Sequence, residues 1–560
     1  MKNKGRFILY DDNNEFQYSK SKSDVKIKFN RIAFIFFIFF IISIIYSIHL
    51  IHLSSRKSDV LIKNKTKVYN ILKRADIVDR NGNFLARTVS SVDIGINPIE
   101  IIDSQKLLLN LKYIFPNKNY ELINSKIKRK KFFWFEKKIS DENYEKIMML
   151  GDKSIKPEEK LIRVYPQKNL FSHIIGQIDD DNNGISGLEK SLDEELKKSK
   201  KTIRLTVDKD IQFLIREELI KFNEIFRTKG SAAILMNVNS GEILALVSLP
   251  DFNPNQRLKI TDTNYINRAT KGVYEFGSVF KTFTLAAGFH EGIIEPKTQF
   301  KNLKKNIDCG KYTIKEYDEK IPPNLTAEQI LIRSGNIGSV RIGQSLGIEK
   351  FRNFIDNLNL IEPIKFDIEE IGLPIKFKWG KCKLATTSYG HGITTTLLQL
   401  ANAYAILTNG GYKINPTLVK KKNNIKNKRI LKNGVSEKIN PILRKIVTLK
   451  EGTASLANIK GYDVGGKTGT AQKSSLGGYS KNKVNTFASI FPSSNPKYTL
   501  VAMLDEPKTN NEYIYNYRDG SGIKYKGTPY NTAGWTTVEV VGHIIEKIGP
   551  ILATKYNEVY

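Results

Sequence analysis

One uninterrupted apolar segment places the strongest constraint on how this chain can fold. From Ile32 to Leu53 the sequence contains no Asp, Glu, Lys or Arg. As an α-helix this segment would be about 33 Å long, which is enough to cross the hydrocarbon core of a bilayer. It is longer than the apolar core of a secretory signal peptide, and no cleavage site of small residues follows it. The segment therefore predicts a transmembrane helix that is retained as a signal anchor.

Basic residues flank this segment on both sides, so charge does not define its orientation. The near flank carries Lys20, Lys22, Lys26, Lys28 and Arg31, and the far flank carries Arg56, Lys57, Lys63, Lys65, Lys67 and Lys73. The positive-inside rule gives no preference for such a pattern, although long domains translocate largely regardless of charge. We expect a cytoplasmic N-terminus and an external C-terminal part, because of the chemistry that the C-terminal part predicts.

Length and composition limit the classes of protein to which the chain can belong. With 560 residues, 40% of them hydrophobic, it is expected to form two or more folded domains. The net charge of +32 is scattered along the sequence, and no zinc-finger spacing or arginine-rich arm is present. We therefore predict no nucleic-acid partner. Anionic lipid headgroups or cell-wall polymer are the expected neighbours of the positive charge.

Cysteine and histidine indicate little chemistry of their own. The two cysteines, Cys309 and Cys382, can form a disulfide outside the cytoplasm, but they do not make a disulfide framework. We favour two half-buried free thiols. The six histidines form no cluster with the spacing of metal ligands, so no metal site is predicted.

Apolar patterns divide the chain into four parts. These are a polar tail over 1–31, the anchor over 32–53, a mixed α and β domain over 54–205, here called the pedestal, and a second domain over 206–560. The second domain contains predicted strands at 232–238, 242–247, 486–491 and 498–504, the first two forming a hairpin. Its predicted helices are 282–289, 394–407 and 536–548. Strands at both ends with helices between them predict one sheet covered by helices, an α+β fold.

The second domain carries a motif that suits nucleophilic catalysis, Ser278-Val279-Phe280-Lys281. Gly277 precedes it and an apolar helical stretch follows it. Residues three apart share a helix face, so the Lys281 amine is expected one turn from the Ser278 hydroxyl. A serine hydroxyl needs a base to become a nucleophile, and a partly desolvated lysine with a lowered pKa can be that base. Ser278 is therefore the predicted nucleophile and Lys281 its base.

Two further motifs follow in the order Ser334-Gly335-Asn336 and Lys467-Thr468-Gly469-Thr470. Ser334 can relay a proton between Lys281 and a leaving amine, and the Asn336 amide can hold the peptide bond of the substrate. The glycine-rich approach to Lys467 allows close contact of the backbone with a ligand. Lys467, Thr468, Gly469 and Thr470 are predicted to bind a terminal carboxylate. The backbone N–H groups of Ser278 and Thr470 would form an oxyanion hole.

Each motif is short, and their order along the chain gives them their weight. Ser-x-x-Lys also begins at Ser19, Ser23, Ser125, Ser480 and Ser494. The rival arrangement is a Ser/His/Asp triad that uses His391, the one histidine in a glycine-rich stretch. Because no Gly-x-Ser-x-Gly elbow accompanies it, we predict a structural role for His391, with Ser388 and His391 capping the helix that follows.

In this order the three motifs resemble the signature of penicillin-binding proteins and serine β-lactamases. After about residue 70 the chain is similar to class B penicillin-binding proteins, and within that class it is most similar to the division-specific FtsI family. Matching patches in the pedestal are 74–82, Arg163-Val164-Tyr165-Pro166 with His173 and Gly176, and 184–189. Matching patches in the second domain are 274–278, 388–392, 466–472 and 530–535.

The resemblance implies an elongated α+β pedestal and a β-lactamase-like transpeptidase domain with an antiparallel sheet. It implies a peptidoglycan D,D-transpeptidase in which Ser278 attacks the D-Ala-D-Ala bond of a stem pentapeptide and a neighbouring stem peptide accepts the acyl group. β-Lactams would trap Ser278. The implied location is the inner membrane at the septum, single-pass, with the catalytic domain in the periplasm. The implied partners are an FtsW-like glycosyltransferase and other division proteins, and no cofactor is implied.

Three alternatives share these motifs. They are an elongation-specific class B enzyme, a hydrolase of the D,D-carboxypeptidase or β-lactamase type, and a non-catalytic β-lactam sensor or scaffold. Two positions depart from the family pattern. Val279 stands where the family commonly has Thr, at a variable position, and Lys168 stands where a glycine is usual. If that turn has a positive φ, Lys168 is strained there.

Overall fold

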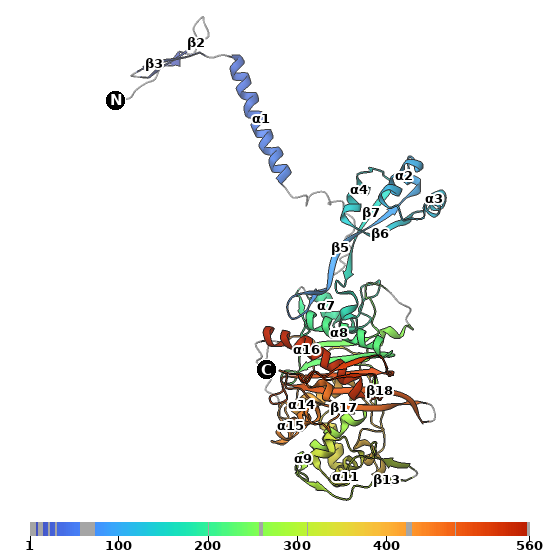
Figure 1. Ribbon diagram of the computed structural model, residues 1–560. Helices are drawn as coiled ribbons and strands as arrows, with labels where there is room; N and C mark the ends of the chain where they lie inside the picture. The colour runs from blue at the N-terminus through green and yellow to red at the C-terminus, as the bar shows by residue number, and fades with distance from the viewer. Residues whose placement is uncertain are drawn as a thin grey trace. The chain divides into compact units, whose positions relative to one another are not determined.

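The computed structural model describes residues 7–8, 15–20, 23–28, 31–55, 73–199, 201–256, 261–310, 312–421, 428–475 and 478–556 (Figure 1). By its internal contacts the chain divides into two compact units, Met1–Ile71 and Leu72–Tyr560. They are described in turn.

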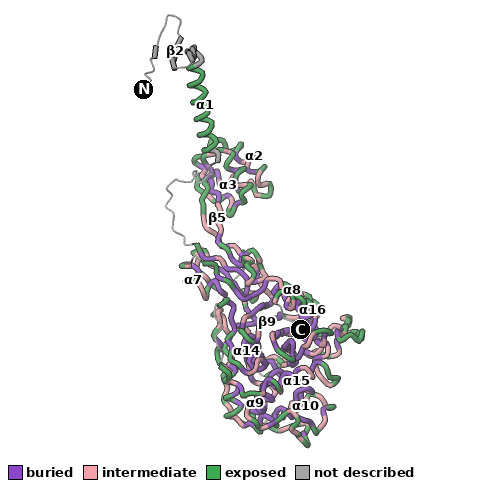
Figure 2. Tube along the Cα trace, turned by 90° about the vertical axis from the view of Figure 1, so that its left-hand side faces the viewer, coloured by how far each residue is buried: buried purple, intermediate pink, exposed green. Residues whose placement is uncertain are grey.

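The first unit contains the predicted apolar helix. Helix α1 runs from Arg31 to Ser55, and its segment Phe34–His52 is long and apolar enough to cross a membrane. The residues of that segment are exposed (Figure 2). The tail before it forms an antiparallel sheet of β1 (Phe7–Ile8), β2 (Glu15–Lys20) and β3 (Ser23–Lys28), which its polar composition did not predict.

A five-stranded antiparallel sheet forms the centre of the second unit, which confirms the predicted fold class. Its order is β10-β9-β19-β18-β17. The strands are β9 (Gly230–Asn237), β10 (Ile243–Leu249), β17 (Gly465–Ser475), β18 (Gly478–Phe491) and β19 (Tyr498–Asp505). The predicted hairpin is therefore β9–β10, and every residue of β10 and β19 is buried. Strand β17 lies at the edge, with one side free of a neighbouring strand.

Helices cover both faces of this sheet (Figure 1). Helices α8 (Lys209–Ile225) and α16 (Thr537–Lys555) pack on one face, and α14 (Leu397–Thr408) and α15 (Val435–Thr448) pack on the other. Figure 2 shows buried residues concentrated where β9 meets α14. Helix α14 begins later than predicted, because Thr396 caps it by a reciprocal capping box with Gln399. The predicted cap by Ser388 and His391 is therefore wrong, and the Ser388 hydroxyl instead donates to the Leu384 carbonyl in the preceding helix.

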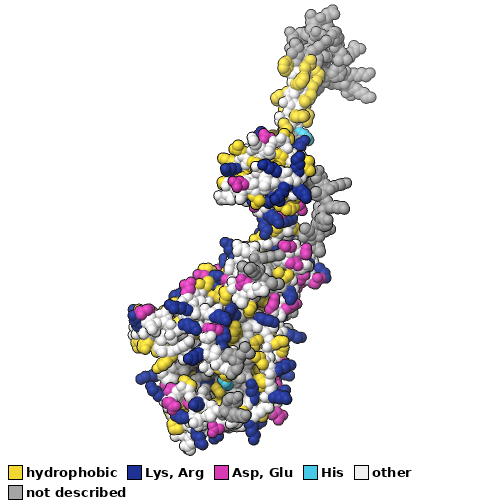
Figure 3. Space-filling view, turned by 90° about the vertical axis from the view of Figure 1, so that its right-hand side faces the viewer, with side chains coloured by type: hydrophobic (Ala, Val, Ile, Leu, Met, Phe, Trp, Pro, Cys, Tyr) yellow, Lys and Arg dark blue, Asp and Glu magenta, His cyan; other side chains and the backbone are white. Residues whose placement is uncertain are grey.

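The remaining elements of this region are short. The strands are β11 (Val273–Tyr274), β12 (Gln299–Phe300), β13 (Asn306–Cys309), β14 (Tyr312–Lys315), β15 (Leu325–Thr326), β16 (Thr395–Thr396), β20 (Ile514–Asn516) and β21 (Lys524–Lys526). The helices are α9 (Lys281–Glu291), α10 (Ala327–Ile332), α11 (Asn336–Leu346), α12 (Ile348–Asn357) and α13 (Lys381–Thr387). On the face drawn in Figure 3, Lys and Arg side chains are spread among Asp and Glu, as expected from the scattered sequence positions.

The pedestal is built on a long two-stranded ribbon. Residues Arg87–Ile96 of strand β5 (Phe84–Ile96) pair with the whole of β7 (Ile155–Val164). The other elements are β4 (Ile77–Val78), β6 (Phe133–Ile139), β8 (Ile203–Arg204), α2 (Ser104–Ile114), α3 (Tyr120–Lys128), α4 (Asp141–Met148), α5 (Ser172–Ile175), α6 (Gly187–Ser191) and α7 (Asp193–Lys198). The residues between the ribbon strands form their own hydrophobic core, separate from that of the sheet.

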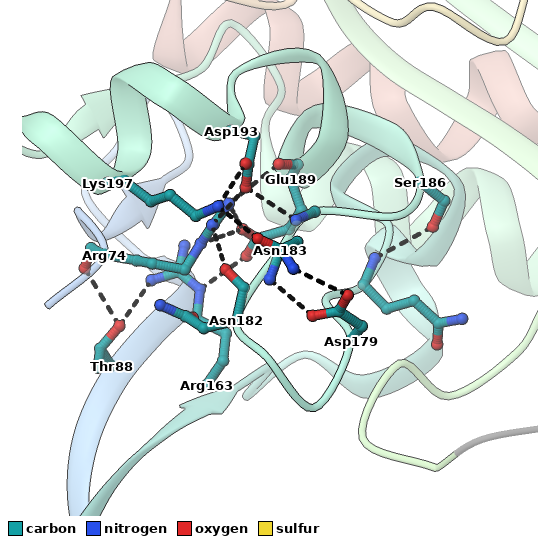
Figure 4. Close-up of polar contacts among 12 residues, drawn as sticks. Arg74, Thr88, Arg163, Asp179, Asn182, Asn183, Ser186, Glu189, Asp193 and Lys197 are labelled. Carbon is teal, nitrogen blue, oxygen red and sulfur yellow. Dashed lines mark hydrogen bonds and ion pairs between the residues drawn. The ribbon is translucent and has the colours of Figure 1, made fainter. Parts of the chain in front are cut away.

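A buried ionic network joins the base of this ribbon to α6 and α7 (Figure 4). Glu189 accepts hydrogen bonds from Arg74 Nε at 3.0 Å and from Arg163 Nε at 2.7 Å, and all three side chains are buried. Arg163 also donates to the Thr88 hydroxyl, and Arg74 forms an ion pair with Asp193 at 2.6 Å. Charges taken out of water are tolerated only when they are paired and hydrogen-bonded in this way.

Two further expectations concern Lys168 and the two cysteines. Lys168 has a φ of 49°, in the left-handed region, so the strain predicted for a lysine in place of glycine is present. Cys309 and Cys382 form a disulfide with Cα atoms 5.3 Å apart, so the interpretation as free thiols is wrong. The bridge spans 73 residues and ties β13 to α13. Restricting the unfolded chain by such a link is worth about 4 kcal/mol in the chain-entropy description.

Candidate active site

The first motif lies where a tight turn becomes a helix. Ser278 is in the 3₁₀ turn Gly277–Phe280, and Lys281 is the first residue of α9. The backbone N–H of Lys281 donates to the Ser278 carbonyl, which places the two residues one turn apart. Lys281 is 1% exposed, whereas Ser278 lines an open cavity of about 680 Å³. The nucleophile is therefore accessible to substrate and its predicted base is buried beneath.

The three motifs converge on the hydroxyl of Ser334. Lys281 Nζ lies 3.3 Å from Ser334 Oγ, and Lys467 Nζ lies 2.9 Å from the same atom. An ammonium or amine N–H donates in both contacts, so the serine oxygen accepts on both lone pairs and its own proton is free to be donated. Lys281 also donates to the Ser334 carbonyl. Ser334 can thus pass a proton to a group in the cavity, which it also lines.

The backbone at Ser334 is strained. Its φ is 58°, a conformation that residues other than glycine rarely adopt and that costs about 1–3 kcal/mol. The strain is maintained by its surroundings, since the Ser334 N–H donates to Leu331 and its hydroxyl is held by two lysines. Strained positions of this kind concentrate at functional sites.

Asn336 begins α11 and is held by Lys281 and by two groups outside the motifs. Its Oδ1 accepts from Lys281 Nζ at 2.6 Å, and its Nδ2 donates to the Lys315 carbonyl at 3.0 Å. The Glu316 carboxylate accepts from the backbone N–H groups of Asn336 at 2.7 Å and Ile337 at 3.2 Å. Glu316 therefore caps α11 from the β13–β14 hairpin, because the N-cap Gly335 has no side chain to do so. One lone pair and one N–H of the Asn336 amide stay available to substrate.

The third motif lies on the edge strand β17, next to the nucleophile. A Cβ at Gly469 would lie 2.1 Å from the Phe276 carbonyl oxygen, so only glycine allows this approach. Thr468 and Thr470 line the cavity with Ser278, and Thr453 from another segment lies 2.7 Å from the Thr468 hydroxyl. On an edge strand the outward backbone N–H groups are free to bind a ligand. β17 can thus offer hydroxyl and N–H donors to an anionic group.

Burial changes the charge state of both lysines. Desolvation lowers the pKa of Lys281 to about 7, although the Glu316 carboxylate acts in the opposite direction. Burial also places the pKa of Lys467 well below its ordinary value, and the nearby Lys281 lowers it further. Two ammonium groups that share one hydroxyl partner repel each other, so the site favours one charged and one neutral lysine. A neutral lysine is the form that can act as a base.

The lowered pKa of Lys281 predicts how acylation depends on pH. Only the neutral amine accepts a proton, so the second-order rate constant for acylation by a penicillin should rise with pH through about 7 and then level off. Between about pH 5.5 and about pH 8 we expect an increase of about 30-fold. Stopped-flow acylation, with circular dichroism to verify folding at each pH, measures this profile. An inflection above about pH 9, typical of a solvated lysine, would contradict it.

The rival triad is not assembled. His391 lines the cavity, but its Nδ1 faces the Glu275 carboxylate at 3.8 Å. Within the described parts of the chain, no hydrogen bond joins His391 to Ser278. Sequence reasoning missed Glu316 and Thr453, which support the second and third motifs. Neither belongs to a recognisable motif, and both reach the site through long-range packing.

Comparison with known proteins agrees with this geometry. Residues 231–520 match the penicillin binding protein transpeptidase domain, and residues 72–221 match the penicillin-binding protein dimerisation domain. A probable peptidoglycan D,D-transpeptidase FtsI of Caulobacter vibrioides is 30% identical over 86% of this chain and 82% of its own length. A probable peptidoglycan D,D-transpeptidase PenA of Neisseria meningitidis is 29% identical over 79% of this chain and 81% of its own length.

A solved structure supports the fold. Penicillin binding protein 3 of Mycobacterium tuberculosis, complexed with aztreonam, superposes with a TM-score of 0.64 at 22% identity, over 85% of this chain and 96% of that protein. With the three motifs gathered around one cavity and both family domains present in order, this chain belongs to the class B penicillin-binding proteins and is a peptidoglycan D,D-transpeptidase.

Proposed function

We propose that this chain cross-links stem peptides at the division septum through an acyl-enzyme on Ser278. The observation that carries the chemistry is the Ser334 hydroxyl held between Lys281 and Lys467 beneath the cavity. In this proposal 1–31 is cytoplasmic, 32–53 is the inner-membrane anchor, and the pedestal (54–205) and the catalytic domain (206–560) are periplasmic. The disulfide supports an oxidising compartment, because such bonds are rare in the cytosol.

Acylation begins with binding of the donor stem peptide. Its terminal carboxylate is bound by Thr468, Thr470 and the charge of Lys467, and its peptide bond by the free part of the Asn336 amide. A bound carboxylate stabilises the charged form of Lys467. The charge on Lys467 in turn favours the neutral form of Lys281, because the two amines share Ser334. Substrate binding thus prepares Lys281 to act as a base.

Bond formation then follows. Neutral Lys281 takes the proton of Ser278 Oγ as it attacks the carbonyl of the penultimate D-Ala. The charge on the carbonyl oxygen is stabilised by the N–H groups of Ser278 and Thr470, each worth about 3–4 kcal/mol. Ser334 donates its free proton to the departing D-Ala amine and regains one from Lys281. The Ser278–Lys281 contact has to tighten on binding, as is common for catalytic pairs.

The amine of a second stem peptide completes the reaction. It attacks the ester, the bond to Ser278 Oγ breaks as a new amide bond forms, and a proton of the attacking amine passes through Lys281 to Ser278. A β-lactam presents a carboxylate beside a strained amide, matches the donor and acylates the same serine. Its acyl group then blocks the cavity.

A septal role distinguishes this proposal from the elongation-specific alternative. The relatives named FtsI support the septal assignment. Depletion of the protein in its own cells is expected to give filaments, because septal cross-linking stops while elongation continues. Wild-type chain expressed from a second copy should restore division, and a Ser278→Ala copy should not. Rounded cells on depletion would instead assign the chain to elongation. Co-purification with an FtsW-like glycosyltransferase is expected in the same cells.

A further inference from the structure

Beside the active-site cavity, a carboxylate that is 12% exposed lies behind aromatic rings, two of which line the cavity. Glu275 lies three residues before Ser278. Its Oε1 accepts from the Tyr479 hydroxyl at 3.0 Å, and its Oε2 accepts from the Gly392 N–H at 3.0 Å. The His391 ring is stacked on Tyr389, with centroids 5.8 Å apart, and lies tilted against Tyr479, with centroids 4.5 Å apart. Tyr389 and His391 line the same cavity as Ser278.

The charge of Glu275 is not neutralised by a basic side chain in direct contact. Among the described residues, its ion-pair contact is with His391 Nδ1 at 3.8 Å. Burial lowers the pKa of His391, against the influence of Glu275, so this ring is largely neutral at physiological pH. Lys383 interacts with Glu275 through charge without an ion-pair contact, and its amine donates to the Gly392 carbonyl. Burial and Glu275 both raise the pKa of Tyr479, which therefore stays a neutral donor.

The rest of the cavity has the opposite character. Lys281 and Lys467 lie buried at its base, and Lys450 and Lys483 line it. These amines suit the carboxylate of a donor peptide and repel a protonated amine. A cationic group is therefore best accommodated on the side of the cavity that His391 lines, where Glu275 and Tyr479 lie against that ring. Carboxylates attract ammonium ions by charge, and aromatic faces attract them through the ring quadrupole.

We propose that Glu275, with the rings of His391 and Tyr479, forms the subsite that receives the acceptor amine as an ammonium ion. A transpeptidase needs such a site, because its second substrate arrives protonated and must be concentrated beside the ester in competition with water. At the ester the ammonium gives up one proton to solvent, and the neutral amine attacks the carbonyl. The C–N bond forms, the bond to Ser278 Oγ breaks, and the second amine proton passes through Lys281 to Ser278. Glu275 thereby determines specificity for amines over water.

A purely structural role for Glu275 makes a different prediction. The carboxylate also connects the turn before Ser278 with Gly392 and β18. If that connection were its whole function, replacing Glu275 would disturb Ser278 and slow acylation together with every later step. A subsite for the acceptor affects only the transfer of the acyl group to charged amines. The inference depends on acyl transfer by Ser278, so acylation by penicillin is followed separately in each preparation.

The test uses the detergent-solubilised full chain with an acyl-D-alanyl thioester as donor. Glycinamide is the cationic acceptor, and hydroxylamine is the acceptor that is uncharged at neutral pH. For Glu275→Gln we expect the KM for glycinamide to rise about tenfold, with the hydroxylamine KM and the penicillin acylation rate constant changed less than about twofold. Glu512→Gln, which removes a carboxylate 81% exposed and paired with Lys526, should behave as wild type.

A second measurement needs no substitution. In the wild-type chain, raising the ionic strength should increase the KM for glycinamide and leave that for hydroxylamine unchanged, because salt screens a charge-dependent step. The proposal is overturned if wild-type KM values for both acceptors respond alike to salt. It is equally overturned if Glu275→Gln slows penicillin acylation as much as it slows amine transfer, or leaves the glycinamide KM unchanged.

Discussion

Replacing Ser278 by Ala is expected to abolish covalent labelling by fluorescent penicillin, by at least about 10⁴-fold in rate. Ser278 is the one residue of its motif that lines the cavity, while Lys281 is buried. Removing the nucleophile leaves the binding groups on β17 intact, so penicillin would still occupy the cavity without forming a bond. Membranes are labelled, denatured and separated on a gel. The wild-type chain should give a stable band and Ser278→Ala none.

Matched controls separate the nucleophile from other serines and from loss of folding. Ser494 also begins a Ser-x-x-Lys pattern, but it is exposed in a bend of the chain. The Ser494→Ala variant should therefore be labelled to the same extent as the wild type. Lys281→Ala keeps the nucleophile and loses its base, and should slow labelling by about 10²–10⁴-fold. A persistent band in Ser278→Ala, with a normal circular dichroism spectrum, would show that another residue is acylated. Failure of the folded wild type to label would favour a scaffold.

Much of this site could be anticipated because its chemistry depends on residue types in a fixed order. Serine, lysine and threonine in three ordered motifs indicated Ser278, Lys281, Ser334 and Lys467, and the structure gathers all four. Glu316 could not be found in this way. Its position over α11 depends on how the β13–β14 hairpin packs, and a lone glutamate among charged residues carries no local signal. The contact of the Asn336 amide with the Lys315 carbonyl was missed for the same reason.

The fold shows the same division between local and long-range information. Continuous apolar runs predicted β9, β10 and β19 because these strands are buried on both faces. Strand β7 was not predicted, since half of its residues are charged and the four residues 156–159 are exposed. The disulfide joins residues 73 apart, so its formation depends on the tertiary contact between β13 and α13. Spacing in the sequence could not decide between that bond and two free thiols.

The second large effect concerns the buried network of the pedestal. Replacing Glu189 by Gln is expected to lower the free energy of unfolding by about 3–5 kcal/mol. Glu189 is fully buried and contacts Arg74 at 2.8 Å and Arg163 at 2.7 Å, so its removal leaves two guanidinium groups in a region that water does not reach. In this variant Arg74 still has Asp193 as a partner, whereas Arg163 has lost its carboxylate partner in the network. Gln has nearly the same shape, which confines the change to charge.

Thermal unfolding of the detergent-solubilised full chain measures this effect, with Glu194→Gln as the matched control. Glu194 lies in the neighbouring helix, is paired with Lys198, and both side chains are about three-quarters exposed, at 75% and 74%. An exposed pair of this kind contributes little, and its loss should change stability by less than about 0.5 kcal/mol. If both variants unfolded at the same temperature, the burial of Glu189 would have no energetic consequence and the network would not hold the ribbon to α6. A large difference would show that burial, rather than the presence of an ion pair, determines how strongly this pedestal depends on one carboxylate.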